Sequence, residues 1–161
     1  MTSDTPLSPT TGKPVPRSQT YEGGCHCGNV RYTVKLSPPL DEMPVTQCTC
    51  SICHINGQLM VYPLESQIEW HSGKDQMTPY NFGPHRITHS FCPVCGTSIG
   101  GKSNDPTFFA NNRALNVRTF RGIDIDKLTL RPVDGRRNMT SKEYQFDESK
   151  HPHNGYGPRI V

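Results

Sequence analysis

Hydrophobic and polar residues alternate at every second position over residues 30–36, which read VRYTVKL. A period of two is typical of a strand with one buried face, so this segment is predicted to be a β-strand. Other short segments are rich in β-branched or aromatic residues and are bounded by Gly, Pro, Asn or Asp, a pattern that also favours strands. These further predicted strands are residues 43–47, 59–62, 68–71, 87–91, 97–101, 107–110, 115–117 and 128–133.

Helical signals are few along the chain. Brief helical turns are predicted at residues 51–55 and 123–127. The chain also contains 14 glycines and 15 prolines, which interrupt long helices and favour turns. The predicted fold class is therefore mainly β.

The composition divides the 161 residues into one domain and two terminal segments. Residues 1–19 hold four prolines among Ser, Thr and Gly and almost no large apolar side chain, so a flexible N-terminal tail is expected. Residues 20–135 form the predicted domain. Residues 136–161 are mostly polar and are predicted to be a C-terminal extension, with no sequence signal that decides between a packed and a loose segment.

This chain has few apolar residues with which to stabilise a core. Only 32% of the residues are hydrophobic, and no window approaches the roughly 18 apolar residues of a membrane span. The first residues lack the apolar stretch of a secretory signal. We therefore expect a soluble, cytoplasmic protein that does not bind a membrane.

The seven cysteines change this picture most. Their number is odd and no secretion signal precedes them, so a disulfide framework is a poor explanation. Metal binding is the alternative that provides enough free energy to fold a small polar domain. The formal net charge is +3, but seven thiolates holding two zinc ions would bring it to roughly zero. The basic balance therefore gives no reason to expect nucleic-acid binding.

The cysteines fall into three clusters with metal-ligand spacing. The favoured grouping joins Cys-x-Cys and Cys-x-x-Cys pairs into a closed four-sulfur site and leaves a local group of three, in which zinc keeps one position open to a ligand from outside the protein. Two alternatives remain open: two cysteines of the middle cluster complete a four-sulfur site with one of the pairs, or His54 closes the three-sulfur site. The favoured four are Cys25, Cys27, Cys92 and Cys95, and the favoured three are Cys48, Cys50 and Cys53.

The full set of motifs resembles the glutathione-dependent formaldehyde-activating family, which includes the centromere protein V branch. The resemblance covers roughly residues 21–133. It is carried by Gly24-Cys25-His26-Cys27-Gly28 with Val30-Arg31-Tyr32, by Cys48-x-Cys50-x-x-Cys53 with Gly57, by Phe91-Cys92-x-x-Cys95-Gly96-Thr97, and by Leu115-Asn116-Val117-Arg118-Thr119.

The resemblance implies a β-tent fold of short antiparallel sheets around two zinc sites. It also implies a structural zinc on the four cysteines, a catalytic zinc on Cys48, Cys50 and Cys53, and carbon–sulfur lyase or synthase chemistry on a thiol adduct such as a glutathione–aldehyde hemithioacetal. The sequence departs from the family at His54, where Arg or Lys is frequent.

Several other side chains are candidates for roles in that chemistry. His54 and His89 are candidates for proton transfer because histidine titrates near neutral pH. Arg86, Arg113 and Arg118 are candidates for binding glutathione carboxylates, although solvated surface charge is the simpler interpretation for each. The only tryptophan, Trp70, is predicted to belong to the core.

Two other classes of function are alternatives to the enzyme. One is a non-catalytic, zinc-scaffolded module that binds protein or chromatin. The other is a zinc-ribbon nucleic-acid binder, which is disfavoured because the sequence has no basic helix and no clustered Arg and aromatic residues.

Overall fold

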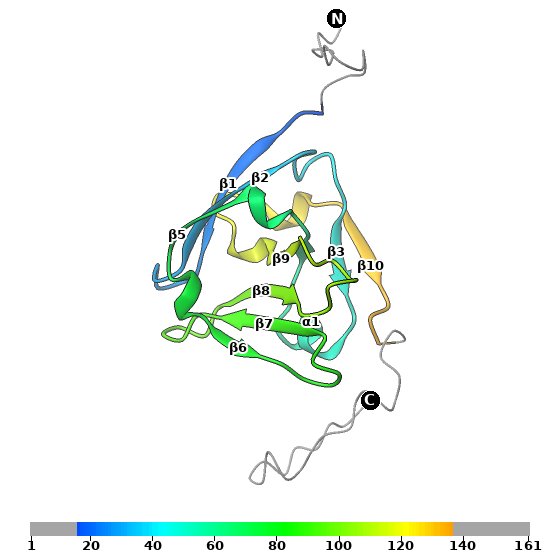
Figure 1. The fold of residues 1–161 in the computed structure, drawn as a ribbon. Coiled ribbons are helices and arrows are strands. Elements are labelled where there is room, and N and C mark those ends of the chain that lie inside the picture. Colours follow the sequence, from blue (N-terminus) through cyan, green and yellow to red (C-terminus); the bar gives the residue numbers. More distant parts are fainter. Residues whose placement is uncertain (1–15, 137–161) are drawn as a thin grey trace, which may run out of the picture.

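The computed structural model describes residues 16–136 and has a mainly β fold, as predicted (Figure 1). Residues 1–15 of the predicted tail and residues 137–161 of the predicted extension lie outside the described residues. The described strands form a three-stranded sheet and a seven-stranded sheet.

The three-stranded sheet has the order β1-β2-β5 and is antiparallel throughout. Its strands are β1 (Gln19–Gly24), β2 (Arg31–Leu36) and β5 (Ile68–Ser72). The alternation in β2 places Tyr32, Val34 and Leu36 in the core and leaves the residues between them at least partly exposed.

The larger sheet has the order β10-β3-β4-β9-β8-β7-β6, and Figure 1 shows β10 and β6 at its two edges. Its strands are β3 (Val45–Cys48), β4 (Met60–Val61), β6 (Thr78–Tyr80), β7 (Ile87–Phe91), β8 (Ser98–Ser103), β9 (Arg113–Asn116) and β10 (Leu130–Val133). The described pairs are antiparallel except for β10 and β3, which run parallel, so the antiparallel expectation fails at this one edge.

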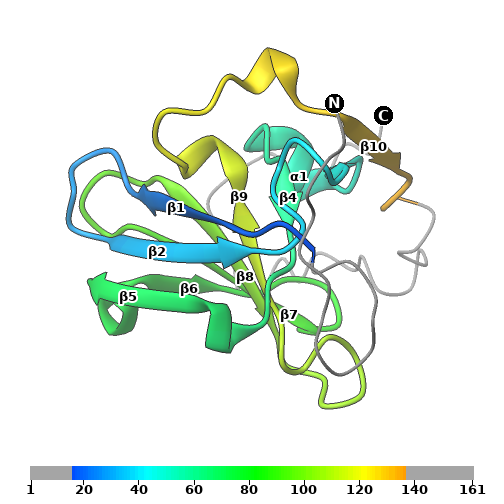
Figure 2. The same ribbon diagram turned by 90° about the horizontal axis from the view of Figure 1, so that it is seen from above.

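The hydrophobic core lies between the two sheets (Figure 2). Tyr32 stands at its centre: its ring lies 5.1 Å from that of Trp70 and 6.2 Å from that of Phe120, between centroids. The Tyr32 hydroxyl is hydrogen-bonded to Thr119 Oγ1 at 2.7 Å, which satisfies the one polar atom of this buried ring. Trp70 is partly buried and packs against the core, in line with its prediction.

The helices are short. The one α-helix of the described residues, α1 (Ser51–Ile55), has the predicted bounds, and a 3₁₀ turn over Ile125–Lys127 lies within the predicted helical segment. Other 3₁₀ turns are Glu65–Gln67, Lys74–Gln76 and Val117–Thr119. Within residues 16–136, no helix has the length and hydrophobicity needed to cross a bilayer.

The structure differs from the predicted strands at three places. Strands β1 and β6 were not predicted, and the strand predicted at residues 107–110 is wrong. That segment is a turn, because the carboxylate of Asp105 accepts hydrogen bonds from both the backbone N–H and the hydroxyl of Thr107. Phe109 in this turn has a positive φ of 49°, which no strand allows.

Candidate metal centres

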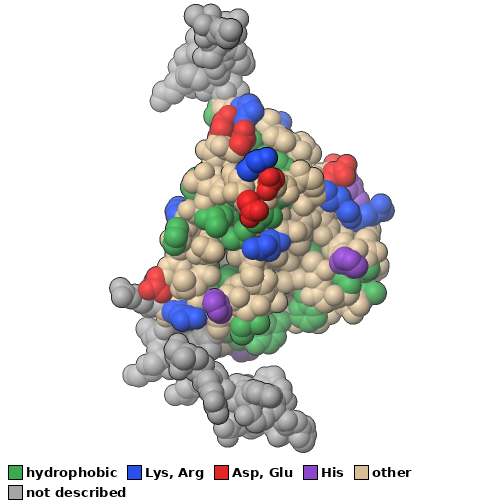
Figure 3. Space-filling model, turned by 180° about the vertical axis from the view of Figure 1, so that it is seen from behind, with side chains coloured by type: hydrophobic (Ala, Val, Ile, Leu, Met, Phe, Trp, Pro, Cys, Tyr) green, Lys and Arg blue, Asp and Glu red, His purple; other side chains and the backbone are tan. Residues whose placement is uncertain are grey.

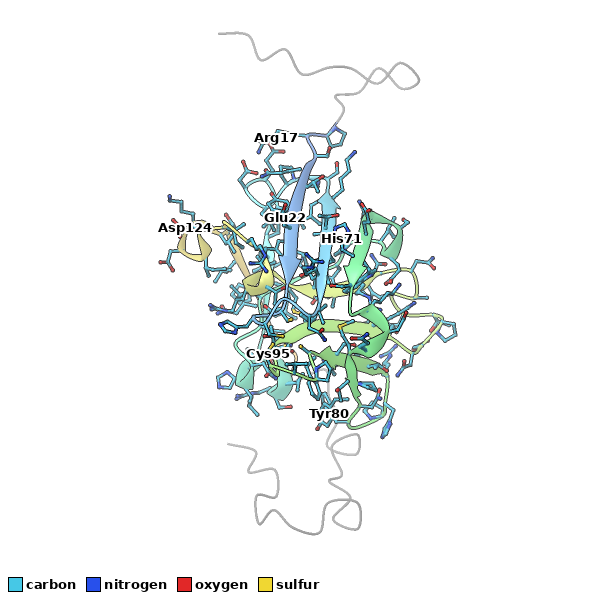
Figure 4. The ribbon with its side chains drawn as sticks, turned by 90° about the vertical axis from the view of Figure 1, so that its left-hand side faces the viewer. Arg17, Glu22, His71, Tyr80, Cys95 and Asp124 are labelled. Atoms are coloured by element: carbon cyan, nitrogen blue, oxygen red, sulfur yellow. The ribbon has the colours of Figure 1, made fainter. Side chains whose placement is uncertain are left out.

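The structure brings four cysteine sulfurs together between the two sheets. Cys25 and Cys27 lie in the connection from β1 to β2, whereas Cys92 and Cys95 lie in the connection from β7 to β8. All four Sγ atoms are within 4.8 Å of one another. Figure 4 shows Cys95 where the lower ends of the blue strands approach the green strands of the larger sheet. This four-sulfur cluster therefore joins one sheet to the other.

The sulfur spacing is compatible with a metal tetrahedron. Cys27 Sγ lies 3.5 Å from Cys25 Sγ and 3.7 Å from Cys92 Sγ. A zinc ion with four Zn–S bonds of about 2.3 Å places its sulfurs roughly 3.8 Å apart. Cys25 and Cys92 are 2% and 0% exposed, so two of the four sulfurs are withdrawn from water.

Backbone and hydroxyl groups support the sulfurs. The Val30 N–H donates to Cys25 Sγ at 3.1 Å. Hydrogen bonds from the Thr97 hydroxyl and backbone N–H lower the pKa of Cys95 to about 5, and so favour the thiolate form that a metal requires. Gly96, at a positive φ of 71°, lets its N–H reach the Cys92 carbonyl at 2.9 Å and closes the turn that presents both sulfurs.

The other three cysteines form a second cluster at the end of β3. Cys48 is the last residue of β3, Cys50 is the N-cap of α1, and Cys53 lies buried inside that helix. Their Sγ atoms are also within 4.8 Å of one another. Among the described residues, no His, Asp, Glu or further Cys joins this three-sulfur cluster. The seven sulfurs are thus grouped as four and three, and the two clusters could each hold a metal ion.

The three thiols of this cluster share their protons unequally. Cys48 accepts hydrogen bonds from the thiols of Cys50 and Cys53 and from the backbone N–H groups of Cys50 and Gly135, and these bonds place its pKa far below the usual value. The Cys48 thiolate and burial in turn raise the pKa of Cys53. Cys48 is therefore the first sulfur of the three to carry negative charge.

Residues 134–136 cross the three-sulfur cluster, and we call them the strap. A Cβ atom on Gly135 would lie 2.4 Å from Cys48 Sγ and 3.0 Å from Cys50 Cβ, so only glycine fits. Thr49 holds the strap on either side: its hydroxyl donates to Asp134 Oδ1 at 3.1 Å, and its carbonyl accepts from Arg136 Nε at 3.0 Å. No local sequence pattern predicts this contact, because it joins segments 87 residues apart.

A hollow of about 320 Å³ is lined by Thr46, two residues before Cys48 on β3, and by none of the three cysteines. Tyr62, which follows β4, lines it and is 38% exposed. Burial, together with the charges of Cys53 and Cys48, raises the pKa of Tyr62 to about 12, which places the phenol within electrostatic reach of the cluster. The described lining residues are Leu36, Ser37, Met43, Pro44, Thr46, Met60, Val61, Tyr62, Pro63, Gln67 and Arg131.

The two candidate histidines lie in different surroundings. His54 is exposed on α1, next to Cys53, and its ring nitrogens are outside the three-sulfur cluster. His89 lies on β7, outside both clusters, with its ring stacked on Phe82 at 5.4 Å. Its Nδ1 is buried without a hydrogen-bond partner, and burial lowers its pKa.

Each of the three candidate arginines already has a partner. Arg113 is buried, its Nε donates to Glu65 Oε2 at 2.8 Å, and its guanidinium lies 5.1 Å from the centre of the Trp70 ring. Arg86 pairs with Asp105 at 3.0 Å. Arg118 Nε donates to the Gly57 carbonyl at 2.6 Å, beyond the end of α1. None of the three lines the hollow.

Comparisons with known proteins agree with this arrangement. A profile of the family described as glutathione-dependent formaldehyde-activating enzyme matches residues 20–120. A crystal structure of a protein from Rhodobacter sphaeroides is 26% identical in sequence and superposes with a TM-score of 0.59. The match covers 69% of this chain and 97% of that one.

Proposed function

Because the chain belongs to the glutathione-dependent formaldehyde-activating enzyme family, we propose that it makes or breaks the carbon–sulfur bond of a thiol–aldehyde adduct, as a carbon–sulfur lyase with two zinc ions. In this proposal the four-sulfur cluster holds a structural zinc. The three-sulfur cluster of Cys48, Cys50 and Cys53 holds the catalytic one.

One observation carries the proposal: the second cluster has three sulfurs and no fourth protein ligand among the described residues. Zinc in proteins takes four ligands in structural sites, whereas catalytic sites leave one position for water or substrate. A zinc ion held by three thiolates also suits a soft sulfur ligand. When bound there, zinc would lower the pKa of a substrate thiol and act as a Lewis acid.

The reaction needs no oxidant or reductant. In the direction of synthesis, the thiol loses its proton and its sulfur forms a bond to the aldehyde carbon. The π electrons of the carbonyl move to its oxygen, which takes up one proton and becomes the hydroxyl of the hemithioacetal. In the lyase direction the same bonds break and form in reverse, so one proton leaves the hydroxyl and one returns to sulfur.

The chain offers two groups beside the cluster that hold exchangeable protons. His54 is the better placed of the two candidate histidines, because it shares a helix with Cys53 and its ring reaches solvent. Tyr62 keeps its proton at neutral pH, since its pKa of about 12 is well above that range. Its hydroxyl is therefore a hydrogen-bond donor toward an oxygen or sulfur in the hollow.

Exchange spectroscopy with ¹³C-formaldehyde and glutathione tests the proposal. The zinc-loaded protein is expected to speed the interconversion of free and adduct carbon well beyond the uncatalysed rate. Cys50→Ser is expected to abolish this acceleration while the fold persists, because the four-sulfur cluster stays intact. His54→Gln and His89→Gln, compared side by side, test whether His54 alone of the two carries protons.

Two results would overturn the proposal. Equal acceleration by Cys50→Ser and the unaltered protein would exclude the three-sulfur cluster as the catalytic site. No acceleration across a panel of thiols and aldehydes by protein that holds both ions would favour a non-catalytic binding module instead.

A further inference from the structure

The hollow lined by Thr46 and Tyr62 has an unbalanced charge. Among its described lining residues the only charged side chain is that of Arg131, on β10. The others are apolar residues together with the hydroxyls of Ser37, Thr46 and Tyr62 and the amide of Gln67. A cavity with one guanidinium and no carboxylate in its described lining attracts an anion.

Arg131 differs in its partners from the arginines that pair with acids. Arg17, Arg86 and Arg113 each form an ion pair with a carboxylate. Arg131 is exposed, and the Nη2 atom of its guanidinium donates to the neutral hydroxyl of Thr46 at 3.2 Å. Within residues 16–136, no carboxylate lies within ion-pair distance of it. The fork is thus anchored at one nitrogen by a neutral partner.

Strand pairing places this guanidinium at a defined distance from the cluster. Arg131 is the parallel partner of Thr46, and Thr46 lies two residues before Cys48 on the same face of β3. Two residues of a strand span about 6.6 Å. A carboxylate one or two residues from a substrate cysteine reaches this distance, because an extended chain advances about 3.3–3.6 Å per residue.

Tyr62 lines the same hollow as Arg131 and adds a second donor. Thr46 pairs with Met60 of β4, and Tyr62 is two residues beyond Met60 on the same face. The side chain of Thr46, which accepts from Arg131, is also close enough to the Tyr62 hydroxyl to influence its pKa. The three side chains therefore converge on one place in the hollow.

We propose that Arg131, together with Thr46 and Tyr62, forms a subsite that binds a carboxylate of the thiol half of the substrate while its sulfur lies at the three-sulfur cluster. This inference rests on the proposed function and specifies its substrate as an acidic thiol. The planar fork of arginine binds a carboxylate through two parallel hydrogen bonds, which an amide or a lysine does not reproduce.

S-methylglutathione provides a test by titration calorimetry on the zinc-loaded protein. It carries the carboxylates of glutathione but no free thiol, so its binding reports on the subsite separately from turnover. We expect Arg131→Gln to weaken binding about tenfold to a hundredfold, the range for a charge-assisted hydrogen-bonded pair. The affinity of Arg131→Lys should lie between those of the unaltered protein and Arg131→Gln. The diethyl ester of S-methylglutathione should bind the unaltered protein weakly, and Arg131→Gln should not change its affinity.

Arg121→Gln is the matched control. It removes the same charge from an exposed arginine that does not line the hollow, and the backbone N–H of Arg121, which the substitution keeps, donates to the Glu22 carbonyl. Its affinity for S-methylglutathione should equal that of the unaltered protein. Circular dichroism on each variant separates loss of the subsite from loss of the fold.

The outcomes separate this inference from the proposed function. Equal affinity of Arg131→Gln and Arg121→Gln, or no binding by the unaltered protein, overturns the subsite even if turnover is observed. Arg131-dependent binding without turnover retains the subsite and overturns the lyase. If Arg131→Gln raises the KM for 2-mercaptoethanol with glyoxylate but not for glutathione with formaldehyde, the carboxylate belongs to the aldehyde half, which overturns the assignment to the thiol.

Discussion

A methyl group added at Gly135 tests how tightly the strap is built onto the three-sulfur cluster. In Gly135→Ala the new Cβ would lie 2.4 Å from Cys48 Sγ. Carbon atoms in ordinary contact are about 3.5–4.0 Å apart, so more than about 1 Å must open. Metal ligands hold their distances within about 0.2 Å, so a metal-bound Cys48 sulfur cannot supply this movement.

The strap can move instead, and the hydrogen bonds that this movement breaks set its cost in free energy. Lifting residues 134–136 breaks the Thr49–Asp134 and Arg136–Thr49 hydrogen bonds and the Gly135 N–H bond to Cys48. Each is worth about 1 kcal/mol or less net, and two of them are exposed, so the total is about 1.4–3 kcal/mol. Because zinc held by protein thiolates contributes roughly 10 kcal/mol in peptides where it has been measured, the strap gives way and the cluster keeps its geometry.

The expected result is a weaker second site beside an unchanged first one. Without metal, the Cys48 thiol can rotate away from the methyl group, so the cost falls on the metal-bound form alone. Metal affinity at the three-sulfur cluster should fall about tenfold to a hundredfold, since 1.4 kcal/mol is a factor of ten. The four-sulfur cluster holds none of the strap residues and should keep its affinity.

Competition with a chromophoric chelator measures both sites in one titration. The unaltered protein should release one ion per chain from the three-sulfur cluster before the other, and Gly135→Ala should move only that first step. Arg136→Ala is the control, because it removes one strap hydrogen bond but adds no atom beside Cys48, and it should move the first step only a few fold. An unchanged first step in Gly135→Ala, or a shift confined to the second, would refute the reasoning.

Two further predictions concern stability. Cys25→Ser is expected to unfold the domain because its cluster joins the two sheets, whereas Cys48→Ser should fold and bind one ion fewer, and circular dichroism with ion counting would expose equal damage from both. Burial alone would raise the pKa of Glu65, but hydrogen bonds from Lys74 and Arg113 outweigh it and lower that pKa to about 2. The carboxylate therefore stabilises the fold above pH about 4.5, and this contribution is lost as the pH falls toward 2. Allowing for partial exposure, Glu65→Gln should lower the free energy of unfolding by about 2 kcal/mol at pH 7 in urea titrations, and no loss would contradict this role.

The two cysteine pairs and the group of three follow from local spacing, which is why they could be predicted from the sequence, whereas the joining of the two pairs is a contact across 65 residues. Cys25 and Cys27, like Cys92 and Cys95, are close enough in sequence that one turn presents both sulfurs. Helix α1 is also a local feature, because its five residues follow Cys48 and Cys50 directly and end shortly before Gly57. In each case the element and its chemistry are contained in a segment of about ten residues or fewer.

The missed strand β1 shows where local patterns fail. Its sequence, QTYEGG, has one large apolar residue and two glycines, a composition that favours a turn. It is a strand because Gly23 lies against the Tyr32 ring, where a Cβ would come within 2.4 Å of Cζ, and because Tyr21 packs on Phe120 with ring centroids 5.6 Å apart. Burial against β2 and Phe120 outweighs the low strand propensity.

The arginine of the candidate site was also missed because a contact between distant segments places it. Arg86, Arg113 and Arg118 were the candidates because they lie near predicted strand ends, yet the arginine in the hollow is Arg131, 85 residues from its partner Thr46. That contact, and the placement of Gly135 on Cys48, both follow from the parallel pairing of β10 with β3. A parallel pair has no connecting turn whose residues could reveal it, and β10 has an exposed, irregular burial pattern with a proline. The ligands of the site are encoded by spacing along the chain, whereas the residues proposed to select its substrate are placed by the register of one edge strand.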